Sequence, residues 1–180
     1  MQITSRVQLI ELMKHRWLPL HAAEVGVAEG IFSTELLSLG LHKLYLIDIW
    51  ETVPFIDGCA SFEQEWHNKN FEDVCNKFRG RQGVVILKGF SYKMALEIRD
   101  ESLGLVYIDG DHSFHGCRAD IHSFWPKLTS GGIMAFHDYG NVNYGVNRAV
   151  QQFAHSEGLE IFELPEDGNI DYLGAYFIKK

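Results

Sequence analysis

One short segment, Glu24-Val25-Gly26-Val27-Ala28-Glu29-Gly30, restricts the fold of this chain more than any other part of the sequence. A short apolar run precedes it, a helical pattern of apolar residues follows, and the next apolar run ends in a second acid, Asp48. This order of strand, glycine turn, helix, strand and acid is typical of a doubly wound α/β sheet, which binds ligands at the carboxyl ends of its strands. Glycine lets the backbone approach a ligand closely, and Asp48 can accept hydrogen bonds from ribose hydroxyls. We therefore expect a nucleoside site here.

The glycine spacing narrows the choice of ligand. A dinucleotide site needs G-x-G-x-x-G, but only Gly26 and Gly30 are present, with Ala28 between them and Ile31 at the third position. A phosphate-binding P-loop needs a lysine that this segment lacks. Glu24 would repel a pyrophosphate and favour an ammonium or sulfonium group. The pattern thus favours a nucleoside without phosphates and with a cationic aminoacyl tail, although a purely structural turn is the other interpretation.

The composition indicates a globular protein and argues against nucleic-acid-binding, membrane and secreted proteins. A chain of 180 residues, with 46% apolar and 22% charged residues, predicts a single globular domain over residues 1–180. The net charge of −8 argues against a nucleic-acid partner. No apolar run approaches the roughly 20 residues of a membrane span, and no leader-like pattern precedes the domain. Three scattered cysteines without a C-x-x-C pair suit a reducing compartment. We expect a cytoplasmic protein.

Apolar runs alternate with helical patterns along most of the chain. The first five runs are continuous rather than alternating, which is typical of parallel strands buried on both faces. No helical pattern separates the last two runs, so we expect an antiparallel hairpin at one edge. An N-terminal helix within 1–18 covers the sheet. The expected strands lie near 21–27, 43–49, 84–87, 105–108, 133–136, 159–164 and 173–178, with helices near 30–39, 61–78, 92–100, 113–128 and 143–157.

Polar residues follow every central strand. They are Glu24, Asp48, Lys88-Gly89, Asp109-Gly110-Asp111-His112 and His137-Asp138. Each has an ordinary explanation as a turn residue, a helix cap or a pair beneath a loop. Buried parallel strands have no structural need for so many polar ends, and together these residues favour a ligand crevice at this edge of the sheet.

These motifs resemble a known family. The segment Glu24–Gly30, Asp48, Ile108-Asp109-Gly110-Asp111-His112-Ser113 and the stretch from Trp125 to His137-Asp138-Tyr139 resemble the class I S-adenosylmethionine-dependent methyltransferases. The similarity is to the small single-domain group in which an Asp-Gly-Asp-His loop pairs with a His-Asp-Tyr loop, and it covers residues from about 20 to 180. It implies an α/β, Rossmann-like sheet of seven strands in the order 3-2-1-4-5-7-6, with strand seven antiparallel and helices on both faces.

The resemblance also implies a donor site. Glu24, Gly26 and Gly30 would line the methionine and ribose portion of S-adenosylmethionine, and Asp48 would bind the ribose hydroxyls. The remaining donor contacts would come from Gly89, Phe90 and Ser91 at the adenine and from Asp109 near the methionine amino group. Phe90 has an alternative role as an ordinary core residue.

Methyl transfer requires alignment of the acceptor with the donor, and a hydroxyl acceptor must also lose its proton. His112 and His137, with Asp109, are the catalytic candidates, although either histidine has an alternative structural role. Related O-methyltransferases of the catechol and macrocin types hold Mg²⁺ at positions that correspond to Asp109, His137 and Asp138, with Asp111 nearby. Because His137 replaces an oxygen ligand, the set suits Mn²⁺ or Zn²⁺ better than Mg²⁺, and a site without any metal is the alternative.

Acceptor binding is expected at residues 50–66, a substrate lid that contains Trp50, Phe55, Phe62 and Trp66, with residues 139–146 opposite. An ordinary amphipathic helix with an apolar loop is the alternative. The function expected is O-methylation of a small molecule or saccharide, with no nucleic-acid or membrane partner, and a homodimer is left open. The rival functions are a metal-dependent hydrolase, a nucleotide-linked oxidoreductase, and a nucleoside-binding domain without catalysis.

Overall fold

The computed structural model describes residues 3, 5–53, 62–166 and 169–180. Its helices are α1 (Gln8–His15), α2 (Ile31–Ser38), α3 (Gln64–Lys77), α4 (Ser91–Met94), α5 (Phe114–Phe124) and α6 (Val146–Glu157), with short 3-10 turns at Ala95–Glu97 and Trp125–Lys127. Its strands are β1 (His21–Val25), β2 (Lys43–Asp48), β3 (Val84–Lys88), β4 (Leu103–Ile108), β5 (Leu128–Phe136), β6 (Phe162–Glu166) and β7 (Asn169–Ile178). None of the helices in the described ranges has the length and apolarity needed to cross a membrane.

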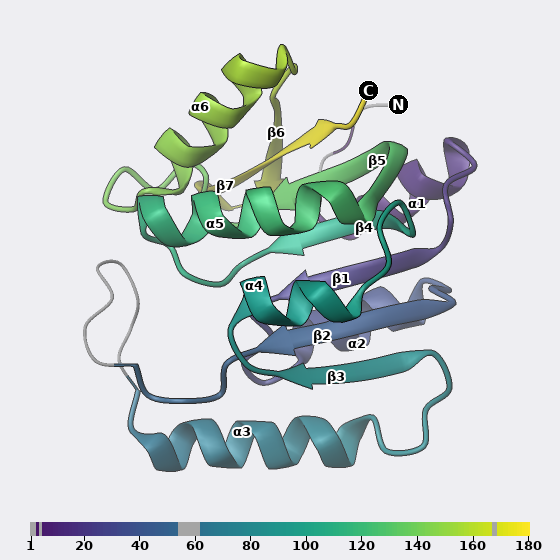
Figure 1. The fold of residues 1–180 in the computed structure, drawn as a ribbon, viewed down its shortest axis with the longest axis vertical. Helices are drawn as coiled ribbons and strands as arrows, with labels where there is room; N and C mark the ends of the chain where they lie inside the picture. The colour runs from purple at the N-terminus through teal and green to yellow at the C-terminus, as the bar shows by residue number, and fades with distance from the viewer. Residues whose placement is uncertain (1–2, 4, 54–61, 167–168) are drawn as a thin grey trace.

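The strands form one seven-stranded sheet in the order β3-β2-β1-β4-β5-β7-β6 (Figure 1). The strands β1 to β5 pair in parallel, whereas β7 runs antiparallel to both β5 and β6. This confirms the fold class, the strand order and the terminal hairpin expected from the sequence. The parallel register brings the carboxyl ends of β1, β2, β3 and β4 to one edge of the sheet.

Each face of the sheet has its own hydrophobic core. The helices α1, α2 and α3 cover one face, where Leu36 and Val74 pack with Leu44 of the sheet. The helices α4, α5 and α6 cover the other face, where Phe124 and Val150 pack with the opposite side of the strands. The central strands β1 and β4 are therefore buried on both sides, which explains their continuous apolar sequences, whereas the edge strand β3 is only partly buried.

Two of the expected helices are shorter than the sequence pattern suggests. The N-terminal helix spans Gln8–His15 rather than most of 1–18, because Trp17 has a left-handed backbone (φ 58°) and Leu18 N–H donates to Met13 O (3.0 Å). The helix expected over 92–100 is a single α-helical turn followed by a 3-10 turn. Apolar spacing predicts where a helix lies better than where it ends, since the last turn often tightens or reverses.

Backbone hydrogen bonds align the loops that follow the strands. Gly26 N–H donates to Ile47 O (2.8 Å), and Asp109 N–H donates to Val25 O (2.7 Å). His137 N–H donates to Ile108 O (3.0 Å), which continues the β4–β5 pairing. These bonds extend the sheet by one residue at each of these strand ends. They therefore fix the backbone from which the polar loop residues project.

The closest approach at this edge is between the glycine loop and Asp109. A Cβ atom on Gly26 would lie 1.9 Å from the carbonyl oxygen of Asp109, and Gly26 has φ +89°. Only glycine satisfies both the space and the backbone conformation at this position.

Gly26→Ala should therefore destabilise the protein more than Gly40→Ala, a matched substitution at φ +94° with no atom within 4 Å of the added Cβ. The left-handed backbone costs both variants about 1–2 kcal/mol, and overpacking adds about 1–3 kcal/mol for Gly26→Ala alone. Urea unfolding at equilibrium measures both differences. Equal losses in the two variants would contradict the close approach.

Candidate functional site

A cavity of about 1230 Å³ lies at the carboxyl ends of β1 to β4. Its wall is formed by the loops after these strands, the starts of α2, α3 and α4, part of α5, and Arg6 before α1. Of the residues expected to bind the donor, those that line it are Glu24, Gly26, Asp48, Gly89, Phe90, Ser91 and Asp109. The sequence-predicted donor residues therefore converge on one cavity, with the exception of Gly30.

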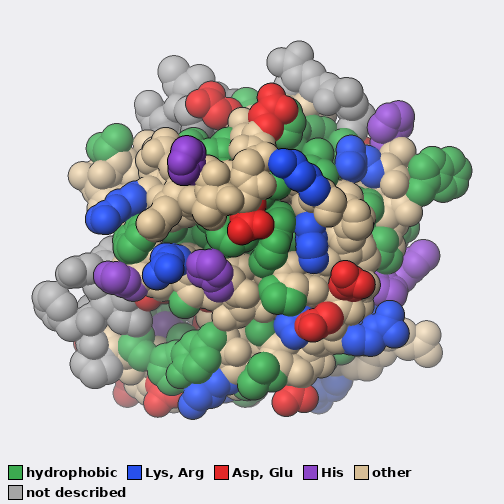
Figure 2. Space-filling model, turned by 45° about the horizontal axis from the view of Figure 1, so that its top comes forward, with side chains coloured by type: hydrophobic (Ala, Val, Ile, Leu, Met, Phe, Trp, Pro, Cys, Tyr) green, Lys and Arg blue, Asp and Glu red, His purple; other side chains and the backbone are tan. Residues whose placement is uncertain are grey.

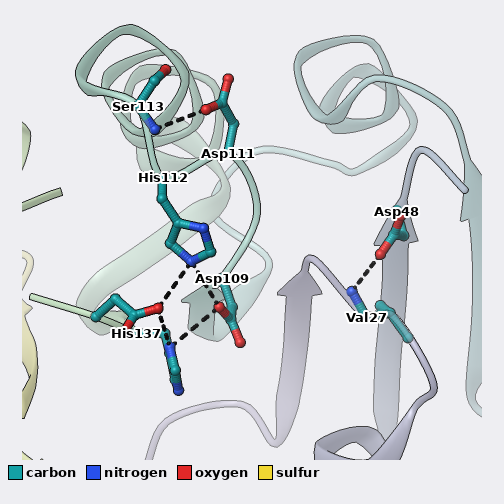
Figure 3. Close-up of polar contacts among 8 residues, drawn as sticks. Val27, Asp48, Asp109, Asp111, His112, Ser113 and His137 are labelled. Atoms are coloured by element: carbon teal, nitrogen blue, oxygen red, sulfur yellow. Dashed lines mark hydrogen bonds and ion pairs between the residues drawn. The ribbon is translucent and has the colours of Figure 1, made fainter. Parts of the chain in front are cut away.

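Asp48 holds the glycine loop. Its Oδ2 accepts hydrogen bonds from Val27 N–H (2.8 Å) and Ala28 N–H (2.9 Å), and its Oδ1 accepts one from Trp50 N–H (2.8 Å). Figure 3 shows the Asp48–Val27 contact at the ends of neighbouring strands. Backbone donors stabilise a carboxylate, so the loop and the acid fix each other's positions.

Trp50 belongs to this arrangement and not to an acceptor surface. Its side chain is fully buried, and Nε1–H donates to Ala28 O (3.0 Å). Both residues have left-handed backbones, with φ 42° for Trp50 and 48° for Ala28. The sequence interpretation placed Trp50 among the acceptor-binding aromatics, and this was wrong because its indole is enclosed beneath the glycine loop.

Gly30 is not among the residues that line the cavity. It precedes α2 with φ +69°, and a Cβ there would lie 3.2 Å from Val74 Cγ2 and 3.3 Å from Phe78 Cε2. The structure therefore places Gly30 at the packing of α2 against α3, rather than beside the methionine and ribose portion as the sequence suggested.

Glu24 lies at the cavity wall but is 2% exposed. Ser33 Oγ–H donates to its Oε2 (2.5 Å). Burial raises the pKa of Glu24 from 4.5 to about 8, although the Ser33 hydrogen bond acts in the opposite direction. The carboxyl is thus mainly protonated at neutral pH, whereas the sequence interpretation gave it a negative charge.

Arg6 lines the same cavity and was not anticipated from the sequence. Its guanidinium lies over the ring of Phe32, 4.4 Å from the centroid, and its positive charge lowers the pKa of Glu24. The sequence offered only a helix-capping pattern at Ser5 and Gln8, with no role for Arg6, so only the folded arrangement reveals a cation at this wall.

Ser91 and the buried Asp120 form a second hydrogen-bonded pair at the cavity. Ser91 Oγ–H donates to Asp120 Oδ1, and Asp120 is 3% exposed. Burial raises the pKa of Asp120 to about 7, the Ser91 hydrogen bond lowers it, and the charge of Asp111 raises it. Asp120 was missed because a single acid within a helical pattern normally lies on the solvent-facing side.

Two histidines and two aspartates meet beside the cavity (Figure 3). His112 Nε2 lies 3.3 Å from Asp109 Oδ1 and 3.2 Å from Asp138 Oδ2. His137 Nδ1 lies 3.4 Å from the same Asp109 oxygen and 2.9 Å from the same Asp138 oxygen. One ligand atom from each residue lies within 4.8 Å of the other three, so the four can hold a metal ion. We call these residues the His/Asp cluster.

Asp138 is the buried member of the His/Asp cluster. Burial acts to raise its pKa, but the contacts with His112 and His137 outweigh this and hold the pKa well below its usual range. Its backbone is left-handed, with φ 55°. Such a conformation in a residue other than glycine is commonly found at functional sites, where the surrounding structure enforces it.

The cluster lies at the boundary of the cavity. Asp109 and His112 line the cavity, whereas His137 and Asp138 are not among its lining residues. Tyr144 stacks on His112 with ring centroids 4.7 Å apart, and the carbonyl of His112 accepts from Gly145 N–H (2.8 Å). The His112 ring is therefore held between the cavity and the loop after β5.

Asp111 points away from the cluster toward the start of α5 (Figure 3). Its Oδ1 accepts from Ser113 N–H (2.8 Å), and Ser113 Oγ in turn accepts from Gly116 N–H (3.0 Å). These contacts are those of a turn followed by a helix cap, which was the structural alternative to a ligand-binding role for this residue.

The segment expected as a lid is only partly described, since Phe55 and the rest of 54–61 lie outside the described residues. Phe62 and Trp66 both line the cavity, and their rings stack with centroids 4.0 Å apart. Phe62 is 43% exposed. Gln64 Oε1 accepts from Thr52 N–H (3.0 Å), which joins the start of α3 to the loop after β2.

On the face of the molecule in Figure 2, acidic and basic side chains are interspersed, and neither sign forms a continuous patch. The four titratable side chains of the His/Asp cluster, by contrast, meet at one place, at the carboxyl edge of the sheet.

Comparisons with known proteins agree with this geometry. Residues 23–139 match the profile of a family described as a methyltransferase domain. The fold is similar to that of the O-methyltransferase NovP, with a TM-score of 0.71 and 17% identity over 97% of this chain and 77% of that one. It is also similar to CalS11, a TDP-rhamnose 3′-O-methyltransferase in calicheamicin biosynthesis, with a TM-score of 0.63 and 18% identity over 96% and 78% of the chains.

A relative in sequence is the uncharacterized protein y4gI of Sinorhizobium fredii, which is 38% identical over 133 residues. The match covers 73% of this chain but only 13% of y4gI. The chain therefore spans a small part of that protein's length.

The raised pKa of Glu24 predicts a dependence of stability on pH. Since the folded-state pKa of about 8 lies above the ordinary 4.5, the native state binds more protons between these values, and its stability falls as pH rises. Glu24→Gln removes this loss, so the variant should gain on the wild type by up to about 1.4 kcal/mol for each pH unit in that window. Urea unfolding at pH 5, 6, 7 and 8 measures the difference. A difference that does not change with pH would contradict the protonated state.

Proposed function

This chain belongs to the class I S-adenosylmethionine-dependent methyltransferase family, and we propose that it transfers the donor's methyl group to an oxygen of a small molecule or saccharide. The observation that carries the proposal is the position of the His/Asp cluster at the boundary of the cavity that the glycine loop, Asp48 and Asp109 line. A donor site and a group of proton acceptors thus share one wall.

Asp48 is suited to the donor's ribose. A carboxylate offers about four lone-pair positions, and three are occupied by the N–H groups of Val27, Ala28 and Trp50. The remaining position is available to a ribose hydroxyl at the cavity wall. Gly26 lets the backbone pass close to the donor, and Asp109 provides an acceptor for its ammonium group.

The His/Asp cluster is suited to deprotonating a hydroxyl. His112 lines the cavity, and Asp138 contacts both imidazoles, which orients them and stabilises their protonated forms. In this proposal His112 takes up the proton of the substrate's hydroxyl group as the hydroxyl oxygen attacks the methyl carbon of the donor. The glycine loop and Asp109 hold the donor in line with that oxygen, and alignment supplies much of the rate.

The nitrogen and oxygen atoms of the His/Asp cluster can also serve as ligands of a divalent cation. Two imidazole nitrogens and two carboxylate oxygens favour Mn²⁺, Zn²⁺ or a similar ion over Mg²⁺, which prefers oxygen ligands. A cation held by Asp109, His112, His137 and Asp138 would lower the pKa of a coordinated acceptor hydroxyl, and His112 would then act as a ligand instead of accepting the proton. The sequence identified three of these residues as ligands, and we add His112 because its Nε2 reaches the same two carboxylates.

The chemical class of the methyl acceptor is inferred from the side of the cavity that Phe62 and Trp66 line. The stacked rings of Phe62 and Trp66 offer a flat apolar surface suited to an aromatic ring or the apolar face of a sugar. CalS11, which has a similar fold, methylates a nucleotide-linked rhamnose according to its name. Both points support a small, ring-containing acceptor.

Calorimetry with S-adenosylhomocysteine tests the donor site. We expect a micromolar dissociation constant, and at least about tenfold weaker binding for Asp48→Ala, because that change removes the charged acceptor of the loop and of the ribose. Asp100→Ala is the control, since Asp100 is exposed and pairs with Lys127 (2.6 Å). No heat of binding with the folded wild type would refute the proposed function.

Cobalt absorption tests the His/Asp cluster independently of activity. Co²⁺ added to the metal-free protein should give visible bands at one ion per chain, and His112→Ala and His137→Ala should each weaken binding at least about tenfold. His155→Ala, on the exposed side of α6, is the matched control. Unchanged bands in both cluster variants would place the metal elsewhere, and no bands in the wild type would exclude the metal site.

A further inference from the structure

The far end of the glycine loop is held by a residue that the methyl transfer described above does not use. Asp48 accepts hydrogen bonds from backbone N–H groups in the middle of the loop. At the end of the loop the carbonyl groups of Glu29 and Gly30 are the acceptors, and the donor is Lys77 in the last turn of α3. Lys77 Nζ lies 2.7 Å from Glu29 O and 3.4 Å from Gly30 O. The loop backbone is therefore attached to two elements, the end of β2 and the end of α3.

Packing fixes the end of α3 next to this part of the loop. An added Cβ at Gly30 would lie 3.2 Å from a side-chain atom of Val74 and 3.3 Å from one of Phe78, and both of these side chains are buried. Lys77, between them in the sequence, is exposed. Removal of its ammonium group therefore leaves the hydrophobic packing of α3 in place.

An ammonium group is well suited to hold two carbonyl groups. It has three N–H donors, and hydrogen bonds from a charged donor are stronger than those between neutral groups. The C=O and N–H of a trans peptide point in opposite directions, so a carbonyl held toward Lys77 also fixes the N–H of the next residue. Glu29 and Ile31 line both the large cavity and a smaller pocket of about 500 Å³, and Lys77 lines the smaller one.

We propose that Lys77 is a positioning residue for methyl transfer, whose ammonium holds the Glu29–Gly30 end of the glycine loop in the conformation that binds the donor. The inference rests on the proposed function, which assigns the donor to the cavity beside this loop. Without the ammonium, Gly30 O keeps the hydrogen bond from Thr34 Oγ (2.9 Å), but Glu29 O loses its side-chain donor. The loop then populates other conformations, and donor affinity falls with the fraction of molecules that are correctly arranged.

Lys69 offers a matched comparison on the same helix. Its Nζ contacts Asp73 Oδ2 (2.7 Å) within α3, and it lines the same small pocket as Lys77. Lys69→Met and Lys77→Met remove the same charge from the same region, but the first breaks a contact within α3 and the second a contact with the loop. The pair separates positioning of the loop from a general effect of charge.

Calorimetry with S-adenosylhomocysteine measures the effect on donor binding. Lys77→Met should bind this compound at least about fivefold more weakly than the wild type, because the charged donor to the loop is lost. Lys77→Arg should restore the affinity to within about twofold, since a guanidinium also donates to carbonyl oxygens. Lys69→Met should bind as the wild type does. Thermal unfolding confirms that each variant is folded.

Hydrogen exchange without ligand measures the loop itself. Peptides that cover residues 24–36 should exchange faster in Lys77→Met than in the wild type, whereas Lys77→Arg and Lys69→Met should match the wild type. Peptides from α5, on the opposite face of the sheet, should be unchanged in all variants. A general loss of stability would accelerate exchange in both regions, so a change confined to the loop is specific to positioning.

The outcomes separate this inference from the proposed function. If the wild type does not bind S-adenosylhomocysteine, the proposed function fails and the inference fails with it. If the wild type binds and Lys77→Met keeps its affinity, or weakens only as much as Lys69→Met, the inference alone is overturned. It is also overturned if affinity falls while exchange of the loop is unchanged, because Lys77 then acts by another route. If Lys77→Met does not fold, Lys77→Ala is measured instead, and wild-type affinity and exchange overturn the inference.

Discussion

The site depends on the contact between one carboxylate and the backbone of one loop. Asp48 ends β2, and the three N–H groups that it accepts belong to the glycine loop after β1 and to Trp50 just beyond β2. The contact forces left-handed backbones on Ala28 and Trp50, and the buried indole of Trp50 completes it from below. Strain of this kind persists only where surrounding contacts outweigh it. The cavity therefore has a preformed wall.

The layout of the fold could be predicted from the sequence because it follows from local patterns. Continuous apolar strands separated by helical segments imply a parallel sheet, and such strands bring their polar ends to one edge. Asp109 and His137-Asp138 were expected together for this reason, and the structure places them in contact. Their exact partners, including the shared contacts of His112, depend on side-chain directions that no periodicity encodes.

The differences arise where tertiary packing decides the role of a residue. Trp50 looks like an acceptor-binding aromatic just after a strand but fills the space beneath the glycine turn, and Gly30 looks like part of a ligand loop but accommodates α3. Asp120 looks like a surface acid in its helix, yet it faces the cavity because α4 and α5 pack together above β4. Burial and the identity of a helix's neighbour are long-range properties, which explains why the sequence pattern did not reveal these three roles.

Packing also determines where the negative charge of the site resides. Glu24 and Asp120, at the cavity wall, have pKa values raised by burial, whereas Asp138 in the His/Asp cluster has a lowered pKa because two histidines contact it. The enclosed wall is thus closer to neutral than its sequence suggests, and full carboxylate charge is retained at the boundary where a hydroxyl would be deprotonated or a cation held. A cationic donor next to Glu24 would favour ionisation of that carboxyl, since an opposite charge stabilises the carboxylate against its burial. Under the proposed function, donor binding would therefore be coupled to the ionisation of Glu24, and the wall would gain its attraction for a sulfonium only when the sulfonium is present.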